Sequence, residues 1–252
     1  MKALIQEKLR EIEQQEQVTI LHCVESGSRA WGFASPDSDY DVRFIYVRPL
    51  KEYLRLEKTR DVIEWQLDES LDINGWDLQK ALRLLYKSNP TLFEWSNSPI
   101  VYQTSSYWQD LRQQIDQHFL DKAGLYHYLS TAQNHYKEYL EKEQVKLKKY
   151  FYALRPILAC KWILERHCPP PMLFTDLVNS QLEEEMKPIV AALIEKKRSI
   201  PELGEGPRID TLNQYIETNL LNLKKQVDVM QETKQNDWQT LNQLFWQALA
   251  VD

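Results

Sequence analysis

Apolar positions in the first hundred residues switch between helical and extended spacing. Residues 1–16 carry apolar side chains every three or four positions, which predicts an amphipathic helix. Short runs rich in β-branched and aromatic residues predict strands at 18–24, 40–47 and 61–67, with extended structure again at 70–73. Asn74-Gly75 then predicts a break in the chain, and residues 76–87 predict a second amphipathic helix.

Past residue 105 the spacing is helical almost throughout. It predicts helices at roughly 106–119, 122–145, 146–167, 183–197, 210–232 and 235–249. Proline and glycine predict breaks at Pro169–Pro171 and Leu203–Pro207. This change of pattern predicts an α+β fold class. We expect a first domain at residues 1–104, with a mixed sheet and helices, and an all-helical domain at residues 105–252.

Composition narrows the classes of partner. The formal net charge of −6 argues against non-specific coating of nucleic acid, although it leaves room for a local basic groove. No stretch approaches the roughly 20 apolar residues that span a bilayer, and the N-terminus has the pattern of a charged helix, not of a signal peptide. Cys23, Cys160 and Cys168 lack metal-ligand spacing. We therefore expect reduced thiols, a cytoplasmic location and no membrane partner.

Two acidic residues open the strand predicted at 40–47. Side chains alternate along a strand, so Asp39, Asp41 and Arg43 share one face while Val42 and Phe44 share the other. The Cα atoms of the two aspartates would lie about 6.5–7 Å apart, close enough for both carboxylates to reach one cation. Mg²⁺ binds through one or two carboxylates together with substrate phosphates. The pair predicts a Mg²⁺ site, against the plainer alternative of a solvated strand edge.

A Gly-Ser pair follows the strand predicted at 18–24. Glycine lets the backbone approach a phosphate closely, and the amides after Gly27 and the hydroxyl of Ser28 can donate to its oxygens. Alone, such a pair is more typical of a turn. Together with Asp39 and Asp41 it predicts one site, in which a triphosphate cradle lies beside carboxylates for two metal ions that serve an in-line displacement.

This ordered combination carries a family resemblance. The segment GSRAWGFASPDSDYDVRFIYV, residues 27–47, resembles the signature of the DNA polymerase β-like nucleotidyltransferase superfamily. It is most similar to the branch of predicted nucleotidyltransferases associated with RNA ligases, as are DINGWDLQKALRLLYKSNPTLFEWSNSP and KKYFYALRPILACKWI. The resemblance covers roughly residues 18–170, and we expect it to extend over the rest of the chain. It implies a polymerase β-like catalytic domain that transfers a nucleoside monophosphate from an NTP, ATP among them, to a hydroxyl or similar acceptor with two Mg²⁺ ions, for which Mn²⁺ can substitute.

The superfamily normally adds a third carboxylate from a neighbouring strand, which completes the metal site and can help to deprotonate the acceptor. The candidates are Glu64, Asp68, Asp72 and Asp77. Asp72 is the best of them, because it lies in an extended segment whose flanking apolar residues face the other way. Asp68 suits a turn, and Asp77 suits the first turn of the following helix. The resemblance therefore assigns Asp39, Asp41 and Asp72 to catalysis and to the metal.

Two arginines flank the predicted site. For Arg43 we favour an ion pair that offsets the charge of the aspartates over a contact to phosphate or acceptor. Arg29 is either a surface side chain or a second phosphate ligand, and it is counted as a nucleotide-binding candidate with Gly27 and Ser28.

Lys148, Tyr152 and Arg155 fall at i, i+4 and i+7 of a predicted helix and so share one helix face. Cations and an aromatic ring suit the phosphates and the base of a nucleotide. The alternative is an ordinary amphipathic helix with solvated cations and a ring in the core. Because helical domains of the superfamily typically close over the nucleotide, the resemblance favours nucleotide binding by all three.

Two functions stay open on the sequence. The first is an active enzyme, whose partners would be an NTP and an acceptor that is an RNA end, a protein or a small molecule. The second is a non-catalytic NTP sensor or antitoxin-like protein-binding module on the same fold. The intact Gly-Ser and Asp-x-Asp motifs, with a third acid available, favour the enzyme. The sequence pattern leaves the oligomeric state open.

Overall fold

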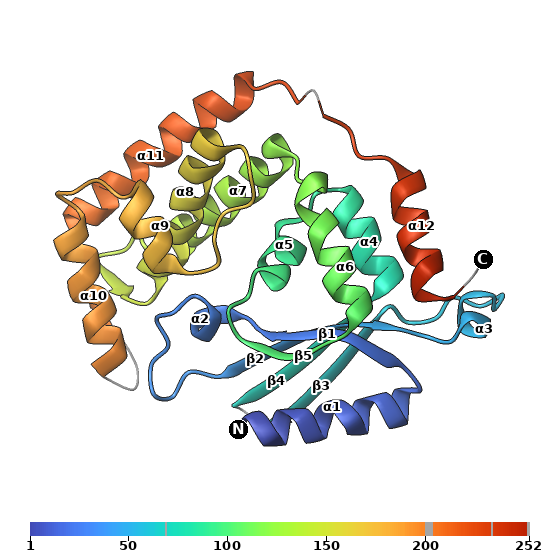
Figure 1. The fold of residues 1–252 in the computed structure, drawn as a ribbon. Helices are drawn as coiled ribbons and strands as arrows, with labels where there is room; N and C mark the ends of the chain where they lie inside the picture. The colour runs from blue at the N-terminus through green and yellow to red at the C-terminus, as the bar shows by residue number, and fades with distance from the viewer. Residues whose placement is uncertain (69, 200–203, 233, 251–252) are drawn as a thin grey trace. The chain divides into compact units, whose positions relative to one another are not determined.

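The computed structural model describes residues 1–68, 70–199, 204–232 and 234–250 (Figure 1). The chain packs into two compact units. The first unit takes its described residues from Met1–Ala30, Asp39–His118 and Asn236–Asp252, and the second takes them from Trp31–Ser38 and Phe119–Gln235. Each unit is therefore assembled from segments that are distant in the sequence.

A mixed β-sheet forms the centre of the first unit. Its described strands are β1 (Thr19–Glu25), β2 (Tyr40–Val47), β3 (Val62–Asp68), β4 (Leu71–Asp77) and β5 (Val101–Thr104), in the spatial order β3-β4-β2-β1-β5. β2 and β4 are parallel, whereas the pairs β1–β2, β1–β5 and β3–β4 are antiparallel. The parallel pair places the first residues of β2 and β4 side by side at one end of the sheet.

Helices cover both faces of this sheet. The described helices of this unit are α1 (Lys2–Glu16), α2 (Gly27–Ala30), α3 (Leu50–Tyr53), α4 (Leu78–Tyr86), α5 (Pro90–Ser96), α6 (Ser106–Ile115), the 3₁₀ helix η1 (Asp116–His118) and α12 (Trp238–Ala248). Figure 1 shows α1 on one face, with α4, α5 and α6 on the other. Apolar side chains of α1 are buried in one core with alternate strand residues, among them Val42, Phe44 and Tyr46 of β2. Asp41 and Arg43, which alternate with them, are thereby turned to the opposite face.

The second unit is mainly helical. Its described helices are α7 (Asp121–Tyr139), α8 (Lys149–Arg166), α9 (Phe174–Gln181), α10 (Lys187–Ser199) and α11 (Asp210–Val229). Two short strands, β6 (Gln144–Lys146) and β7 (Glu205–Pro207), pair antiparallel within it. The α+β class is confirmed, although the helical half is not helical throughout. In the described part of the chain, no helix is long and apolar enough to cross a membrane.

The first half of the chain follows its predicted pattern except around Asn74-Gly75 and at three short elements, α3, α5 and β5. The strand predicted at 40–47 is β2, residue for residue. The predicted break at Asn74-Gly75 is wrong, because both residues lie inside β4. A Cβ on Gly75 would overlap the ring of Phe44, so this glycine serves packing and not a turn. Asp77 precedes the helix, where its carboxylate caps α4 by accepting the N–H of Gln79 at 2.8 Å.

Several boundaries in the helical half differ from the prediction. The helix predicted at 122–145 ends at Tyr139, and β6 occupies part of the remainder. The short elements α3, α5, β5 and α9 were not predicted, because runs of four to eight residues are too brief to establish a period. In the predicted break at 203–207, Leu203 lies outside the described residues, while Glu205–Pro207 form β7.

The domain boundary at residue 104 stays a prediction. In the packing of the chain, α6, η1 and the C-terminal α12 belong with the sheet, and residues 31–38 belong with the helical unit. A change of hydrophobic period cannot reveal such exchanges, because each segment packs with residues far from it in the sequence.

Candidate active site

The predicted acidic residues of the site lie at the beginning of β2 and β4. In the parallel register of these strands, Asp41 stands beside Asp72. Val42 and Ile73, which follow them, are both fully buried in the core under α1. Alternation therefore turns both aspartates to the other face of the sheet. The fold thus provides the neighbouring-strand position expected of Asp72, while its role stays a prediction.

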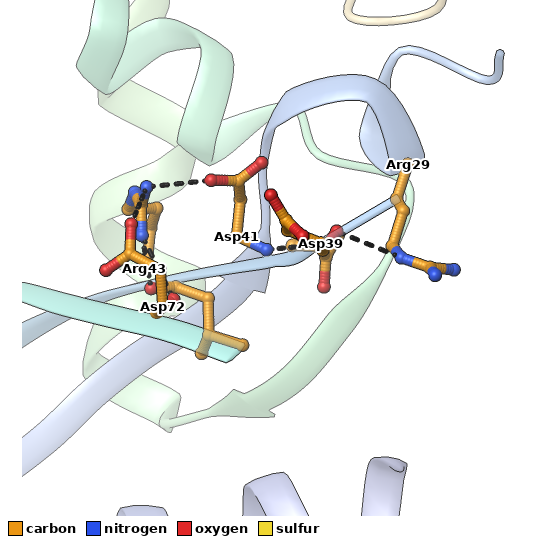
Figure 2. A network of polar contacts seen from close by, with 7 residues as sticks. Arg29, Asp39, Asp41, Arg43 and Asp72 are labelled. Carbon is orange, nitrogen blue, oxygen red and sulfur yellow. Dashed lines mark hydrogen bonds and ion pairs between the residues drawn. The ribbon is translucent and has the colours of Figure 1, made fainter. Parts of the chain in front are cut away.

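Arg43 joins these two carboxylates. Its Nη2 donates to Oδ1 of Asp41 at 3.0 Å and to Oδ2 of Asp72 at 2.7 Å (Figure 2). Its Nη1 donates to the backbone carbonyls of Val42 and Asp72, at 3.0 and 3.2 Å. The contacts agree with the expected ion pair that offsets the charge of the aspartates.

Asp39 and Arg29 meet through the backbone of the loop before β2. Asp39 precedes the strand, and its side chain is exposed. Its carbonyl oxygen accepts the Nε–H of Arg29 at 3.1 Å, as Figure 2 shows, and the Arg29 guanidinium lies 3.7 Å from the centroid of the Tyr40 ring. Arg29 therefore braces the chain where it enters β2. A contact from Arg29 to phosphate stays a prediction.

The surroundings of Asp41 make its ionised form less favourable than it is in water. Burial raises the pKa of this carboxyl above its ordinary value, and the neighbouring charges of Asp72 and Asp39 raise it further. The Arg43 guanidinium opposes them without cancelling the shift. A carboxylate under such repulsion gains from a nearby cation.

Gly27 lies against the carboxyl group of Asp41. Its backbone is left-handed, with φ +59°, and a Cβ at this position would overlap Oδ2 of Asp41. The N–H of Ser26 donates to the Asp41 carbonyl at 2.8 Å, which holds the two segments together. The Gly-Ser motif and the Asp-x-Asp motif are therefore in direct contact, while their joint role as one site stays a prediction. Ser28 follows within α2.

A fourth acidic residue, buried beneath the site, was not predicted. Glu25, the last residue of β1, is fully buried, and its Oε1 accepts the N–H of Asp41 at 2.7 Å. Its Oε2 accepts the hydroxyl of Tyr102. Burial raises the pKa of the Glu25 carboxyl above its ordinary value, although both hydrogen bonds lower it. The only local signal is a glutamate that ends an apolar strand directly before the Gly-Ser motif.

The donor chemistry of the site suits a hard divalent cation. Asp39, Asp41 and Asp72 offer carboxylate oxygens, which Mg²⁺ and Mn²⁺ accept as ligands. Among the described residues, no group of three or more His, Cys, Asp or Glu side chains is placed to hold a metal ion as it stands. The positive group between Asp41 and Asp72 is the guanidinium of Arg43. The donor set fits Mg²⁺, and a bound ion would compete with Arg43 for these carboxylates.

Comparison with known proteins decides the family. A model described as "RNA repair pathway DNA polymerase beta family" matches residues 1–247. The chain belongs to this RNA repair polymerase β family. Membership confirms the resemblance carried by residues 27–47 and makes the chain a polymerase β-like nucleotidyltransferase.

A curated protein and a solved structure are also similar to this family member. The chain is 46% identical over 247 residues to the "Uncharacterized protein YcgL" of Bacillus subtilis (strain 168), an alignment that covers 97% of this chain and 95% of that protein. A solved structure, the nucleotidyltransferase-like protein from Exiguobacterium sibiricum 255-15, matches 89% of this chain and 74% of its own with 16% identity and a TM-score of 0.32.

The remaining nucleotide-binding candidates of this polymerase β family member lie in its second unit. Lys148 directly precedes α8, and Tyr152 is half-buried with its ring edge to Trp31, at 5.5 Å between centroids. Arg155 is only 3% exposed; its guanidinium lies 4.7 Å from the Trp31 ring centroid and donates to the Met172 carbonyl at 3.4 Å. These contacts place the Arg155 guanidinium in the interior of the second unit, beside Trp31. Nucleotide contacts by the three residues stay a prediction.

Replacing Arg43 by Gln should make the stability of this family member more sensitive to Mg²⁺. Without the guanidinium, Asp41 and Asp72 lose their common counter-charge, and we expect the free energy of unfolding to fall by about 1–2 kcal/mol in metal-free buffer. Millimolar Mg²⁺ should then raise the melting temperature of Arg43→Gln more than that of the parent. Thermal unfolding with and without Mg²⁺ measures both effects.

Arg55 supplies a matched control for this experiment. It also pairs with two carboxylates, those of Glu52 and Glu57, but its own side chain is about half exposed. Arg55→Gln should respond to Mg²⁺ as the parent does. An equal Mg²⁺ response in Arg43→Gln and the parent would show that Arg43 and a cation do not compete for Asp41 and Asp72.

Proposed function

We propose that the protein is a metal-dependent nucleotidyltransferase that transfers a nucleoside monophosphate from an NTP to an acceptor hydroxyl and releases pyrophosphate. One observation carries the proposal: the carboxyl group of Asp41 lies directly against Gly27 and stands beside Asp72 on the parallel strand. A phosphate held by the Gly-Ser segment would therefore meet carboxylates from two strands. Membership of the polymerase β family supports the same chemistry.

Each part of the site has a task in this reaction. The backbone N–H groups after Gly27 and the hydroxyl of Ser28 donate to phosphate oxygens. Asp39, Asp41 and Asp72 would hold Mg²⁺, which when bound neutralises phosphate charge and orients the attacking and leaving oxygens. Arg43 keeps Asp41 and Asp72 together before nucleotide binds.

The bond changes follow from an in-line displacement. The acceptor hydroxyl gives its proton to a carboxylate, for which Asp72 is the candidate, and its oxygen forms a bond to the α-phosphorus of the NTP. The bond from that phosphorus to the oxygen bridging to the β-phosphate breaks. Pyrophosphate leaves with the electron pair.

We place an RNA end first among the possible acceptors. The family description names an RNA repair pathway, and a short RNA end is compatible with a chain whose formal net charge is −6. A protein side chain or a small molecule would use the same displacement, and they are the alternatives that the experiment distinguishes. A reducing, cytoplasmic setting is part of the proposal, with free Cys23, Cys160 and Cys168 in its support.

Pyrophosphate release tests this function. The purified protein is incubated with Mg²⁺, one NTP at a time and total cellular RNA, beside Asp39→Asn as the control. We expect release with at least one NTP from the parent and none from the variant. Binding of NTP without release under any combination of NTP and acceptor would favour a non-catalytic sensor.

Ser28→Ala should weaken nucleotide use mildly. The hydroxyl supplies one hydrogen bond to phosphate, whereas the backbone amides of the cradle remain, so we expect a two- to tenfold rise in KM, roughly the worth of one net hydrogen bond. Steady-state pyrophosphate release at varied NTP measures it. A parental KM would remove Ser28 from the cradle.

A further inference from the structure

The residues directly before the Gly-Ser motif hold Asp41 by its backbone. The carboxylate of Glu25 accepts the Asp41 N–H at 2.7 Å, and the N–H of Ser26 donates to the Asp41 carbonyl at 2.8 Å. Gly27 then lies against the Asp41 carboxyl group. Three consecutive residues thus fix the peptide groups and the side chain of one aspartate.

Glu25 is itself held on several sides. Its N–H donates to the Ile100 carbonyl at 2.9 Å, and its own carbonyl accepts the hydroxyl of Ser98 at 2.6 Å. Tyr102 donates its hydroxyl to the carboxylate from the neighbouring strand β5. The side chain therefore has a single defined position in the core.

A buried carboxylate is a costly means of satisfying one backbone N–H. Taking a carboxyl group out of water is unfavourable unless its hydrogen bonds are made, and an apolar residue would otherwise suit the end of the buried strand β1. What the carboxylate provides is a strong, directional acceptor at the first paired residues of β2, where Asp41 must be aimed. Groups that orient a metal ligand contribute in this way to metal binding.

We propose that Glu25, held by Tyr102, is a positioning residue that fixes Asp41 for metal binding. The proposal rests on the metal-dependent function proposed above. It concerns the hydrogen bond to the Asp41 backbone and does not require Glu25 to touch metal or nucleotide.

Asp77 provides the control for a merely structural role. It is also a buried carboxylate of the same sheet, and it also accepts one backbone N–H, from Gln79, and one tyrosine hydroxyl, from Tyr53 at 2.8 Å. It lies five residues beyond Asp72 along β4, or about 16 Å at the rise of a strand. Loss of either carboxylate should lower stability, but only loss of Glu25 should loosen Asp41.

The test measures how tightly the whole chain binds Mn²⁺ alone, monitored through the EPR signal of the free ion. The melting temperature of each variant is measured in parallel. We expect Glu25→Met to bind Mn²⁺ about 10–100-fold more weakly than the parent, the usual effect of removing a group that orients a metal ligand. Glu25→Gln should bind nearly as the parent does, because its amide oxygen still accepts the Asp41 N–H. Asp77→Leu should lose melting temperature and keep parental Mn²⁺ affinity.

A second pair of variants keeps the proposal testable if Glu25→Met does not fold. Tyr102→Phe removes the hydroxyl that holds Glu25, and Tyr53→Phe removes its counterpart at Asp77. We expect weaker Mn²⁺ binding only in Tyr102→Phe.

Each outcome decides between the two proposals. Parental Mn²⁺ affinity in Glu25→Met, or an equal loss in Asp77→Leu, overturns the role of Glu25 and leaves the proposed function standing. No Mn²⁺ binding by the parent at millimolar concentration overturns the proposed metal site and the positioning role with it.

Discussion

Asp41→Asn is expected to abolish nucleotidyl transfer without lowering the stability of the metal-free protein. Changing a group that merely supports a metal ligand already costs about 10–100-fold, so loss of the ligand charge itself should cost more than about 100-fold in rate. Stability should hold because burial and the charges of Asp72 and Asp39 raise the pKa of Asp41, so that its ionised form is unfavourable in the folded state. Pyrophosphate release and thermal unfolding measure the two effects.

The pH dependence of stability gives this prediction a sign. A carboxyl group whose pKa is raised on folding destabilises the folded state, and this penalty is complete at pH values above the folded-state pKa. It fades as the pH falls through the folded-state pKa and is gone below the unfolded-state pKa of about 3.9. At neutral pH the free energy of unfolding of Asp41→Asn should therefore equal or exceed that of the parent, and the difference should shrink as the pH is lowered. Asp77 titrates in both proteins and cancels, whereas the Asp41 charge also raises the pKa of Glu25, so its loss in the variant shifts the difference in the same direction. A lower melting temperature for Asp41→Asn in metal-free neutral buffer would contradict the electrostatic account.

Gly27→Ala is expected to remove activity and to destabilise the first unit. A left-handed backbone costs an alanine roughly 1–2 kcal/mol, and φ at Gly27 is +59°. The new methyl group would also overlap Oδ2 of Asp41, so the carboxyl group must move from its place between Gly27 and Arg43. Because one substitution disturbs the phosphate cradle and the metal ligand together, we expect transfer to fall below detection. Urea unfolding and pyrophosphate release measure the change.

Gly204 is the matched control for that substitution. A Cβ there would meet nothing within 4 Å, and Gly204 is not among the described glycines with positive φ. Gly204→Ala should retain both stability and activity. If Gly27→Ala were as active as the parent, the close approach of Gly27 and Asp41 would have no part in the reaction.

Local pattern determined how well each element of the fold could be predicted. YDVRFIYV combines alternation with β-branched and aromatic residues, and it forms β2 from its first residue to its last. Asn-Gly is ordinarily a turn signal, but Gly75 lies in a strand because the ring of Phe44, from the neighbouring strand, fills the space of a side chain. The strands β6 and β7 are three residues each, and only their pairing across the sequence defines them.

Local pattern also determined which residues of the candidate site could be predicted. Asp39, Asp41, Gly27 and Ser28 could be proposed because they form two short motifs in a fixed order, and Asp72 because the resemblance implies a third carboxylate and its neighbours alternate in a strand. Glu25 could not, because a glutamate at the end of an apolar run has the pattern of a strand that reaches solvent. Its partner Tyr102 is 77 residues away, and only the fold brings the two side chains together.

Transfer of label from NTP to an acceptor tests the central claim most directly. NTPs labelled at the α-phosphate are incubated with Mg²⁺, the protein and a cell extract, and the RNA, protein and small-molecule fractions are then separated. We predict that the parent labels one fraction, RNA ends first among them, and that Asp41→Asn at equal stability labels none. Labelling by Asp41→Asn at the parental level would contradict the assignment of Asp41 and its neighbours as the active site.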